Sequence, residues 1–169
     1  MIKYIYFFAA IFCSLQAELL LPKLNTNTIV SDIFGKTPVD CIYLGMTTYH
    51  MDKRWRDRND NWNNQAIGIQ YKSMFVTTLV NSHYNRSYTF GITRDWFGYK
   101  PNKDIKLTLG YRLGGIYGYG AELNKWAELS PVLPIYQLCS QVQYKRLRLE
   151  FSYFRNLFSA YLTIVYGEY

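Results

Sequence analysis

Apolar and polar residues alternate along most of the chain beyond Cys41, with a period of two residues. This is the period of a β-strand, whose successive side chains point to opposite faces of a sheet. Residues 105–114 show it most clearly, because Ile, Leu and Tyr occupy one face and Lys, Thr, Gly and Arg the other. Runs of this kind, separated by turn-rich stretches, predict strands at 41–50, 65–73, 74–82, 86–95, 105–114, 134–144, 146–154 and 159–169.

Alternation alone fits two folds. In a transmembrane barrel the apolar rows face lipid and the polar rows line the lumen, whereas in a soluble exported β-sandwich the apolar rows form the core. The predicted strands approach the ~9–11 residues of a tilted membrane strand. Long connections (51–64 and 115–133) also alternate with short turns near Lys72 and Lys145. We therefore predict an all-β fold, an eight-stranded antiparallel transmembrane up-and-down β-barrel, with the sandwich as the alternative.

The N-terminal segment has the pattern of a secretory signal peptide. Lys3 precedes a short apolar core, and Ala17 is a small residue suited to the cleavage site. The apolar core is about half of the ~20 residues that a membrane-spanning helix needs. The expected organisation is a signal peptide (1–17), a mostly irregular or partly helical periplasmic strap (18–40) and the barrel (41–169), located in the outer membrane.

The order of the predicted hairpins assigns the two ends of the barrel. If the first strand rises from the periplasm, the outer rim carries the strand ends at His50, Ser82, Gly114 and Phe154. The last predicted strand places Tyr161, Val165 and Tyr169 on one face. Such a terminal aromatic strand resembles the insertion signal of outer-membrane proteins.

The chain is basic, with a formal net charge of +7. This charge fits either solvated loops or attraction to anionic lipid head groups, and the scatter of basic residues over alternating strands argues against a nucleic-acid partner. Cys41 and Cys139 could pair in an oxidising compartment or serve as small apolar residues. With His50 and His83 as the histidines, no cluster has metal-ligand spacing, so no metal or cofactor is expected. The expected partners are membrane lipids, and the expected state is a monomer.

Arginine side chains mark two places where lipid or acidic partners could bind. The segment 52–64 carries Arg54, Arg56 and Arg58 beside two tryptophans. It fits either a solvated loop with interfacial aromatic residues or a clamp for the phosphates of lipopolysaccharide. Arg112 lies on a predicted lumen-facing row, where a buried guanidinium needs an acidic partner such as Glu150 or Glu122.

Several motifs occur in an order that resembles the lipid A palmitoyltransferase (PagP) family. Tyr49-His50 ends the first predicted strand, and the Gly-containing AIGIQY (66–71) follows it. Next comes an element, Asn81-Ser82-His83-Tyr84-Asn85, which ends the third strand and precedes Gly91. The segments LTLGYRLGG (107–115) and SPVLPIY (130–136) also match their counterparts. The resemblance covers about four-fifths of the mature chain and rests on motif spacing.

The resemblance implies an eight-stranded outer-membrane barrel that transfers a palmitoyl chain from phospholipid to lipid A. The family uses His, Asp and Ser at the outer rim, and these map to His50, Asn81 and Ser82. Asn81 departs from the pattern, since an amide cannot hold an imidazolium by charge, although it can orient a histidine. Gly91 lies on a row of small lumen-facing residues that leaves room for an acyl chain, whereas Arg112 occupies a position where the family has something small and uncharged.

Two function hypotheses follow. The first is an acyltransferase that uses His50 and Ser82 with Asn81 as the orienting group, and it predicts an apolar cavity reaching from the rim to mid-barrel. The second is a non-catalytic barrel with a lipid-binding or envelope-structural role. It predicts a lumen plugged by charged side chains, namely Lys106, Arg112, Arg148 and Glu150.

Overall fold

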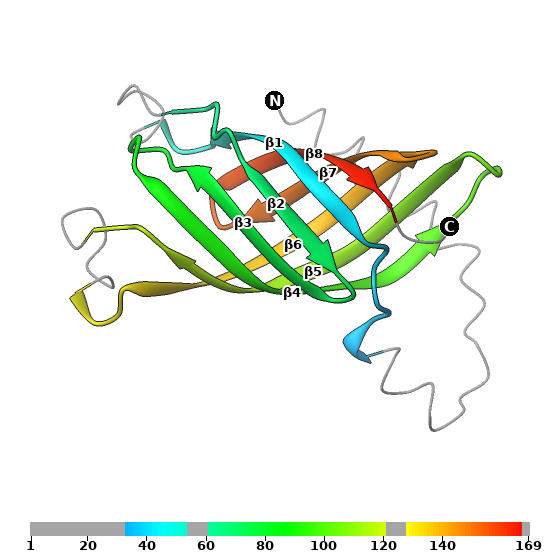
Figure 1. Cartoon of the computed structure of the whole chain (residues 1–169), viewed down its shortest axis with the longest axis horizontal. Coiled ribbons are helices and arrows are strands. Elements are labelled where there is room, and N and C mark those ends of the chain that lie inside the picture. The colour runs from blue at the N-terminus through cyan, green and yellow to red at the C-terminus, as the bar shows by residue number, and fades with distance from the viewer. Residues whose placement is uncertain (1–32, 54–60, 121–127, 167–169) are drawn as a thin grey trace.

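The computed structural model describes residues 33–53, 61–120 and 128–166, and these form a closed barrel of antiparallel strands (Figure 1). Each strand pairs with its neighbours in sequence, and the first pairs with the last. The strands are β1 (Cys41–His50), β2 (Ile67–Tyr71), β3 (Met74–Val80), β4 (Arg86–Tyr99), β5 (Ile105–Tyr117), β6 (Val132–Tyr144), β7 (Leu147–Phe154) and β8 (Leu157–Val165). The all-β, eight-stranded barrel prediction is confirmed, and the sandwich alternative is wrong.

Strand bounds differ from the sequence prediction mainly at β2, β4, β5 and β8, where β8 spans Leu157–Val165 in place of 159–169. β2 starts at Ile67, not at residue 65, because Gln65 has a φ of 43° and interrupts the strand. β4 continues to Tyr99 instead of 95 and β5 to Tyr117 instead of 114, and the two strands pair from Tyr88 to the end of β4. A bulge between Asp95 and Phe97 shifts the register of this long hairpin by one residue.

The two ends of the barrel differ in their connections. The terminal end, where β1 begins and β8 ends, has turns at 72–73 and 145–146 and a loop at 100–104. The loop end carries the connections 51–66, 81–85, 118–131 and 155–156. Figure 1 shows the β4–β5 hairpin projecting at the terminal end and the β5–β6 connection at the opposite one. The predicted long connections at 51–66 and 118–131 and short turns at 72–73 and 145–146 are present, whereas 81–85 and 100–104 are equally long and 155–156 is a tight turn at the loop end.

Side chains in this barrel are distributed in the reverse sense to a soluble protein. Large apolar residues of every strand point outward, including Ile69, Val76, Phe90, Leu113, Leu138, Leu149 and Leu162. The rows that point inward are mostly polar and buried, among them Gln70, Thr77, Thr89, Thr108, Gln141, Glu150 and Thr163. The predicted lumen-facing rows of β4, β5 and β7 are confirmed.

A buried ion pair between Arg112 and Glu150 crosses the interior. The Arg112 guanidinium also donates to the Tyr43 hydroxyl at 2.7 Å, and its carbon lies 4.6 Å from the centre of the Phe75 ring. The rings of Tyr43 and Tyr161 lie 5.2 and 5.1 Å from the same carbon. Three aromatic rings thus surround the cation while a carboxylate neutralises it, which lowers the cost of burying the charge.

Hydrogen bonds extend this pair into a chain across the lumen. Gln141 donates to Glu150 at 3.2 Å and accepts from Arg148 at 3.2 Å. On the other side Tyr43 donates to Gln70 at 3.0 Å, and Gln70 donates to the Val39 carbonyl at 2.9 Å. These contacts make the interior both polar and packed, although Arg112 Nε has no hydrogen-bond partner among the described residues.

The described part of the predicted strap, residues 33–40, lies against the bulge in β4. Lys36 pairs with Asp95 through two main-chain hydrogen bonds of 2.7 and 3.0 Å. The Trp96 indole donates to the Ile33 carbonyl at 3.2 Å, and the Tyr111 hydroxyl donates to the Phe34 carbonyl at 2.8 Å. These contacts hold the strap on the barrel. Among the described residues no helix is long and apolar enough to cross a membrane.

Two details differ from or add to the sequence analysis. Tyr161 and Val165 share one face as predicted, but this face is the interior one, where Tyr161 packs beside Arg112. Cys41 and Cys139 are buried free thiols, and Arg148 donates to the Cys41 sulfur at 2.6 Å. The predicted signal peptide (1–17), most of the strap (18–32) and Tyr169 lie outside the described residues.

The ion pair predicts strong coupling between its two residues. Arg112→Met leaves a buried carboxylate and Glu150→Gln leaves a buried guanidinium, so each single change should cost about 3–5 kcal/mol. The double variant should cost clearly less than the sum, because neither charge remains. Urea unfolding of the barrel in detergent micelles measures all of these values, and strictly additive costs would contradict the coupling.

Candidate functional site

At the loop end an imidazole and a hydroxyl meet. His50 is the last residue of β1, Ser82 lies in the connection after β3, and His50 Nε2 is 3.0 Å from Ser82 Oγ. Ser82 is buried and His50 is half-buried. The sequence prediction named both residues, and the structure places them in hydrogen-bond contact. This distance is the one that proton transfer from a hydroxyl to an imidazole requires.

Two asparagines of the first loop hold this pair in place. Asn61 donates from its amide side chain to the carbonyls of Val80 and Asn81, each at 3.3 Å, and from its main chain to the Ser82 carbonyl at 2.9 Å. Asn64 donates to the Val80 carbonyl at 2.8 Å and accepts from the Thr48 hydroxyl at 2.9 Å. Residues 61–64 therefore bridge β1 and β3 just before the start of β2.

Sequence analysis did not identify Asn61 and Asn64. The available signal was the run Asn61-Trp62-Asn63-Asn64 just before β2, because asparagine side chains commonly replace main-chain partners where a strand becomes irregular. The sequence pattern alone predicts only a loop for this run. Its role depends on the two strands that flank it, which a local pattern does not reveal.

Asn81 shapes the loop beside Ser82. The oxygen of its side-chain amide accepts hydrogen bonds from the main-chain nitrogens of His83 and Asn85 at 2.9 and 3.1 Å. Its amide nitrogen donates to Ser87 Oγ at 3.0 Å and to the Gly118 carbonyl at 3.2 Å. The side chain is fully buried and uses both of its ends in these contacts. The amide thus joins the β3–β4 connection to the end of β5.

The remaining predicted site residues lie in three different places. Arg54, Arg56 and Arg58 lie outside the described residues. Gly91 faces Gly114 across β4 and β5, and a Cβ at Gly91 would overlap the Leu113 carbonyl, so close strand approach explains this glycine. Arg112 is in the interior, bonded to Glu150, as predicted. The structure therefore brings His50, Ser82 and Asn81 together at the rim and places Arg112 below them.

Hydroxyl groups line the interior beside the rim. Ser87, Thr89, Ser152 and Ser159 are buried and point inward. Thr89 and Thr77 share a 2.5 Å hydrogen bond. Ser152 and Ser159 occupy facing positions on β7 and β8, and their hydroxyls have no hydrogen-bond partner among the described residues. The lining is therefore polar rather than the apolar cavity that the acyltransferase hypothesis predicts.

Comparison of the chain with protein-family models and with curated protein sequences gives no match. Among the described residues, no group of His, Cys, Asp and Glu side chains is arranged to hold a metal ion.

Asn81→Asp tests the structural role of this amide. The carboxylate loses both donated hydrogen bonds and faces the Gly118 carbonyl, so the barrel should lose about 1–3 kcal/mol of stability. Unfolding midpoints in detergent micelles measure the loss. The matched control is Asn85→Asp, an exposed position in the same connection. Equal midpoints for the two variants would contradict the assigned role.

Proposed function

We propose that this chain is an integral barrel of the outer membrane, with its loop end facing outward, and that it contacts membrane lipid without conducting solutes. The single observation that carries the proposal is the reversed distribution of side chains. Apolar residues cover the outside of every strand, and polar residues fill the inside. In water this arrangement exposes a large apolar surface, whereas a bilayer covers it.

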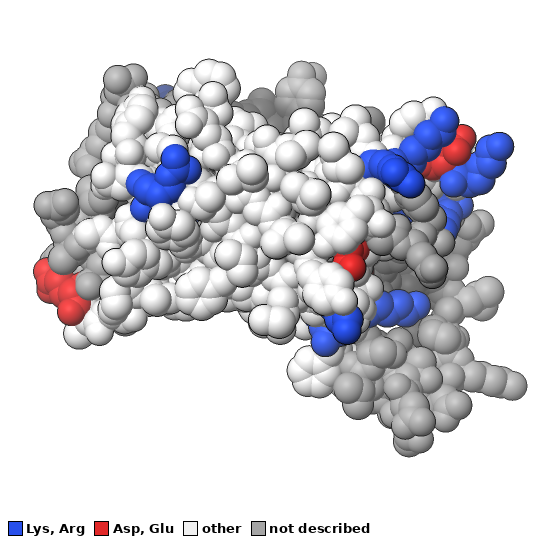
Figure 2. All heavy atoms as spheres, in the orientation of Figure 1, with Lys and Arg blue, Asp and Glu red and all other residues white. Residues whose placement is uncertain are grey.

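The distribution of charge supports the same proposal. Figure 2 shows a broad uncharged area across the middle of the barrel, with lysine and arginine gathered mainly at one end. Aromatic residues flank this area on both sides. Tyr71, Tyr99 and Tyr144 are exposed at the terminal end, and Tyr49, Tyr84 and Tyr117 at the loop end. Two aromatic girdles around an apolar band are typical of membrane barrels.

The packed interior favours a structural or lipid-contacting role over a channel. Arg112, Glu150, Tyr43 and Gln70 are each at most 1% exposed, and they contact one another across the lumen. The non-catalytic hypothesis predicts a plug of this kind. A barrel of this size encloses only enough space for its own side chains or one small ligand, so a water-filled pore has no room.

Membrane insertion predicts a specific behaviour on expression in a Gram-negative host. The protein should fractionate with the outer membrane and migrate faster on a gel without heating than after boiling. Both results follow because the closed barrel resists detergent until heat unfolds it. Recovery in the soluble periplasmic extract, or identical migration before and after boiling, would contradict the proposal.

A second candidate function, acyl transfer at the outer rim, has one specific observation in its favour. His50 Nε2 and Ser82 Oγ are 3.0 Å apart, and the motif order resembles that of lipid A palmitoyltransferases. In this candidate the imidazole takes the proton of the hydroxyl, which attacks the ester carbonyl of a phospholipid; the ester bond breaks and the lysophospholipid leaves with that proton. A hydroxyl of lipid A then takes the acyl group from Ser82, and its proton returns through the imidazole to Ser82 Oγ. Arg112 and Glu150 occupy the lumen below, so the acyl chain would extend only into the part nearest the rim.

Mass spectrometry of lipid A decides between the two candidates. The host should lack its own palmitoyltransferase, and the matched variants are His50→Ala, Ser82→Ala and the neighbouring His83→Ala. Acyl transfer predicts a lipid A species heavier by one acyl chain, which disappears in the first two variants and persists in the third. A non-catalytic barrel predicts an unchanged spectrum from a correctly inserted protein.

A further inference from the structure

A hollow opens at the mouth of the lumen, at the terminal end of the barrel. It encloses about 330 Å³, part of it continuous with solvent, a size at the lower end of the range for small-molecule sites. Its lining comes from the strap, the β4–β5 loop and inward-facing positions of β5 and β6, among them Val39, Lys100, Lys103, Asp104, Lys106 and Gln143. The hollow therefore faces the lumen and the water at its mouth, on the opposite side of the sheet from the apolar wall.

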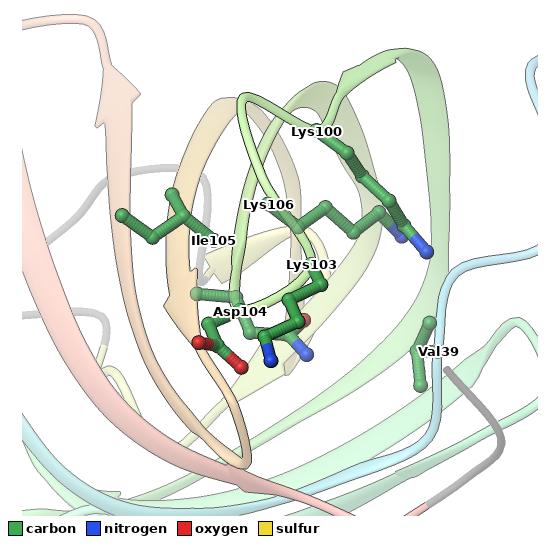
Figure 3. A pocket seen from close by; sticks show the side chains of 7 residues that line it. Val39, Lys100, Lys103, Asp104, Ile105 and Lys106 are labelled. Carbon is green, nitrogen blue, oxygen red and sulfur yellow. The ribbon is translucent and has the colours of Figure 1, made fainter.

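Three lysine side chains, the hollow lysines Lys100, Lys103 and Lys106, surround the opening. Figure 3 shows the amine ends of Lys100 and Lys106 directed to the same side. These two amines are close enough to repel each other. Among the described residues, no carboxylate forms a salt bridge with any of the hollow lysines. The hollow thus brings together like charges that an anion between them would stabilise.

Two carboxylates only partly offset this positive charge. Asp104 is half-buried in the lining. Asp95 is buried on β4 and interacts electrostatically with Lys106 and Arg148, and its Oδ1 has no hydrogen-bond partner among the described residues. The ion pair deeper in the lumen is neutral. The hollow lysines and Arg148 therefore face two acids, so two positive charges remain without a counter-charge. A dianion balances both of them, whereas a monoanion leaves one.

Hydrogen bonds fix the loop that carries two of the hollow lysines. The side-chain oxygen of Asn102 accepts from the main-chain nitrogens of Asp104 and Ile105, each at 2.9 Å. The Asp104 carbonyl accepts from the main-chain nitrogen of Lys145 at 2.8 Å, which ties the loop to the β6–β7 turn. Because the backbone is already held in place, binding of an anion requires little further ordering of the loop.

We propose that this hollow binds the phosphate dianion of a small water-soluble molecule. Protonated lysine amines donate up to three hydrogen bonds each, and charge-assisted bonds to phosphate oxygens are among the stronger ones. The lumen mouth admits such a molecule from the aqueous side, whereas membrane lipid lies on the other face of the wall. The assignment of that aqueous side to the periplasm rests on the proposed membrane insertion, but binding itself does not.

The Asp104 carboxylate opposes a bound anion because it lies in the same lining. Asp104→Asn should therefore raise the affinity for phosphate by about threefold or more, since a like charge beside the ligand is removed. Loss of the hollow lysines should lower the affinity. Opposite effects from neighbouring positions are difficult to obtain by general destabilisation of the loop.

Isothermal titration calorimetry of the barrel in zwitterionic micelles measures binding of inorganic phosphate and of glycerol 3-phosphate. Slightly alkaline buffer of low ionic strength keeps both ligands dianionic. The affinity should fall by about tenfold or more when three attractive charges are lost in the triple variant Lys100→Gln, Lys103→Gln, Lys106→Gln. The matched control removes the same charge from exposed positions at the same end that do not line the hollow, namely Lys72→Gln, Lys145→Gln, Arg146→Gln. More distant charges are screened, so the control should lose less than about threefold.

Equal losses in the two triple variants would overturn the proposal, because the basic end as a whole would then attract the anion. Weaker phosphate binding by Asp104→Asn, or binding of acetate as tight as that of phosphate, would also contradict it. Loss of phosphate binding in nanodiscs that contain phosphatidic acid, with retention in phosphatidylcholine alone, would assign the site to a lipid head group instead. Tighter binding of glycerol 3-phosphate than of inorganic phosphate would support an organic phosphate, and the reverse order the free ion. Outer-membrane fractionation tests insertion separately, so the two proposals fail independently.

Discussion

The structure depends on one buried contact, the ion pair between Arg112 on β5 and Glu150 on β7. These strands are not neighbours, and β6 lies between them. The pair therefore ties together two strands that do not pair with each other, and Tyr43 joins it to β1, which lies across the lumen from β5. In a soluble protein an apolar core would do this work. Here the outside of the wall is apolar, so directional polar contacts must supply the specificity that packing alone cannot give.

The sequence determines the wall more clearly than the rim. Strict alternation on β5 and β7 allowed the lumen rows to be predicted, with Glu150 as one of two candidate partners of Arg112, because a period of two fixes the face of each residue. The first and last residues of the strands were less predictable. The start of β2 depends on Gln65, and the extension of β4 depends on a bulge and on the pairing of Lys36 with Asp95. These are long-range contacts that a local pattern does not contain.

At the rim too, a local pattern predicts some residues, whereas others depend on contacts between distant parts of the chain. His50 and Ser82 were predicted from the resemblance of motifs, and their contact follows from the folded positions of β1 and β3. The asparagines that hold them, Asn61 and Asn64, were missed because they act on main-chain groups of strands distant in sequence. Asn81 was assigned by alignment of a motif to an acid, yet its amide donates two hydrogen bonds that a carboxylate cannot make. The hydrogen bonds that the Asn81 side chain makes in the β3–β4 connection are thus enough to explain an amide at this position.

The backbone of the tight turns carries a further implication. Lys72, Lys145 and Arg155 adopt φ values of 53°, 52° and 54°, in the left-handed region that glycine tolerates best. A side chain there costs about 1–2 kcal/mol relative to a residue without a Cβ. Each of these turns therefore carries a long cationic side chain at a position where glycine would adopt the backbone conformation at a lower free-energy cost. A redesign of the barrel for thermal stability would start with glycine at these positions, and it would remove positive charge from both edges of the apolar band at once.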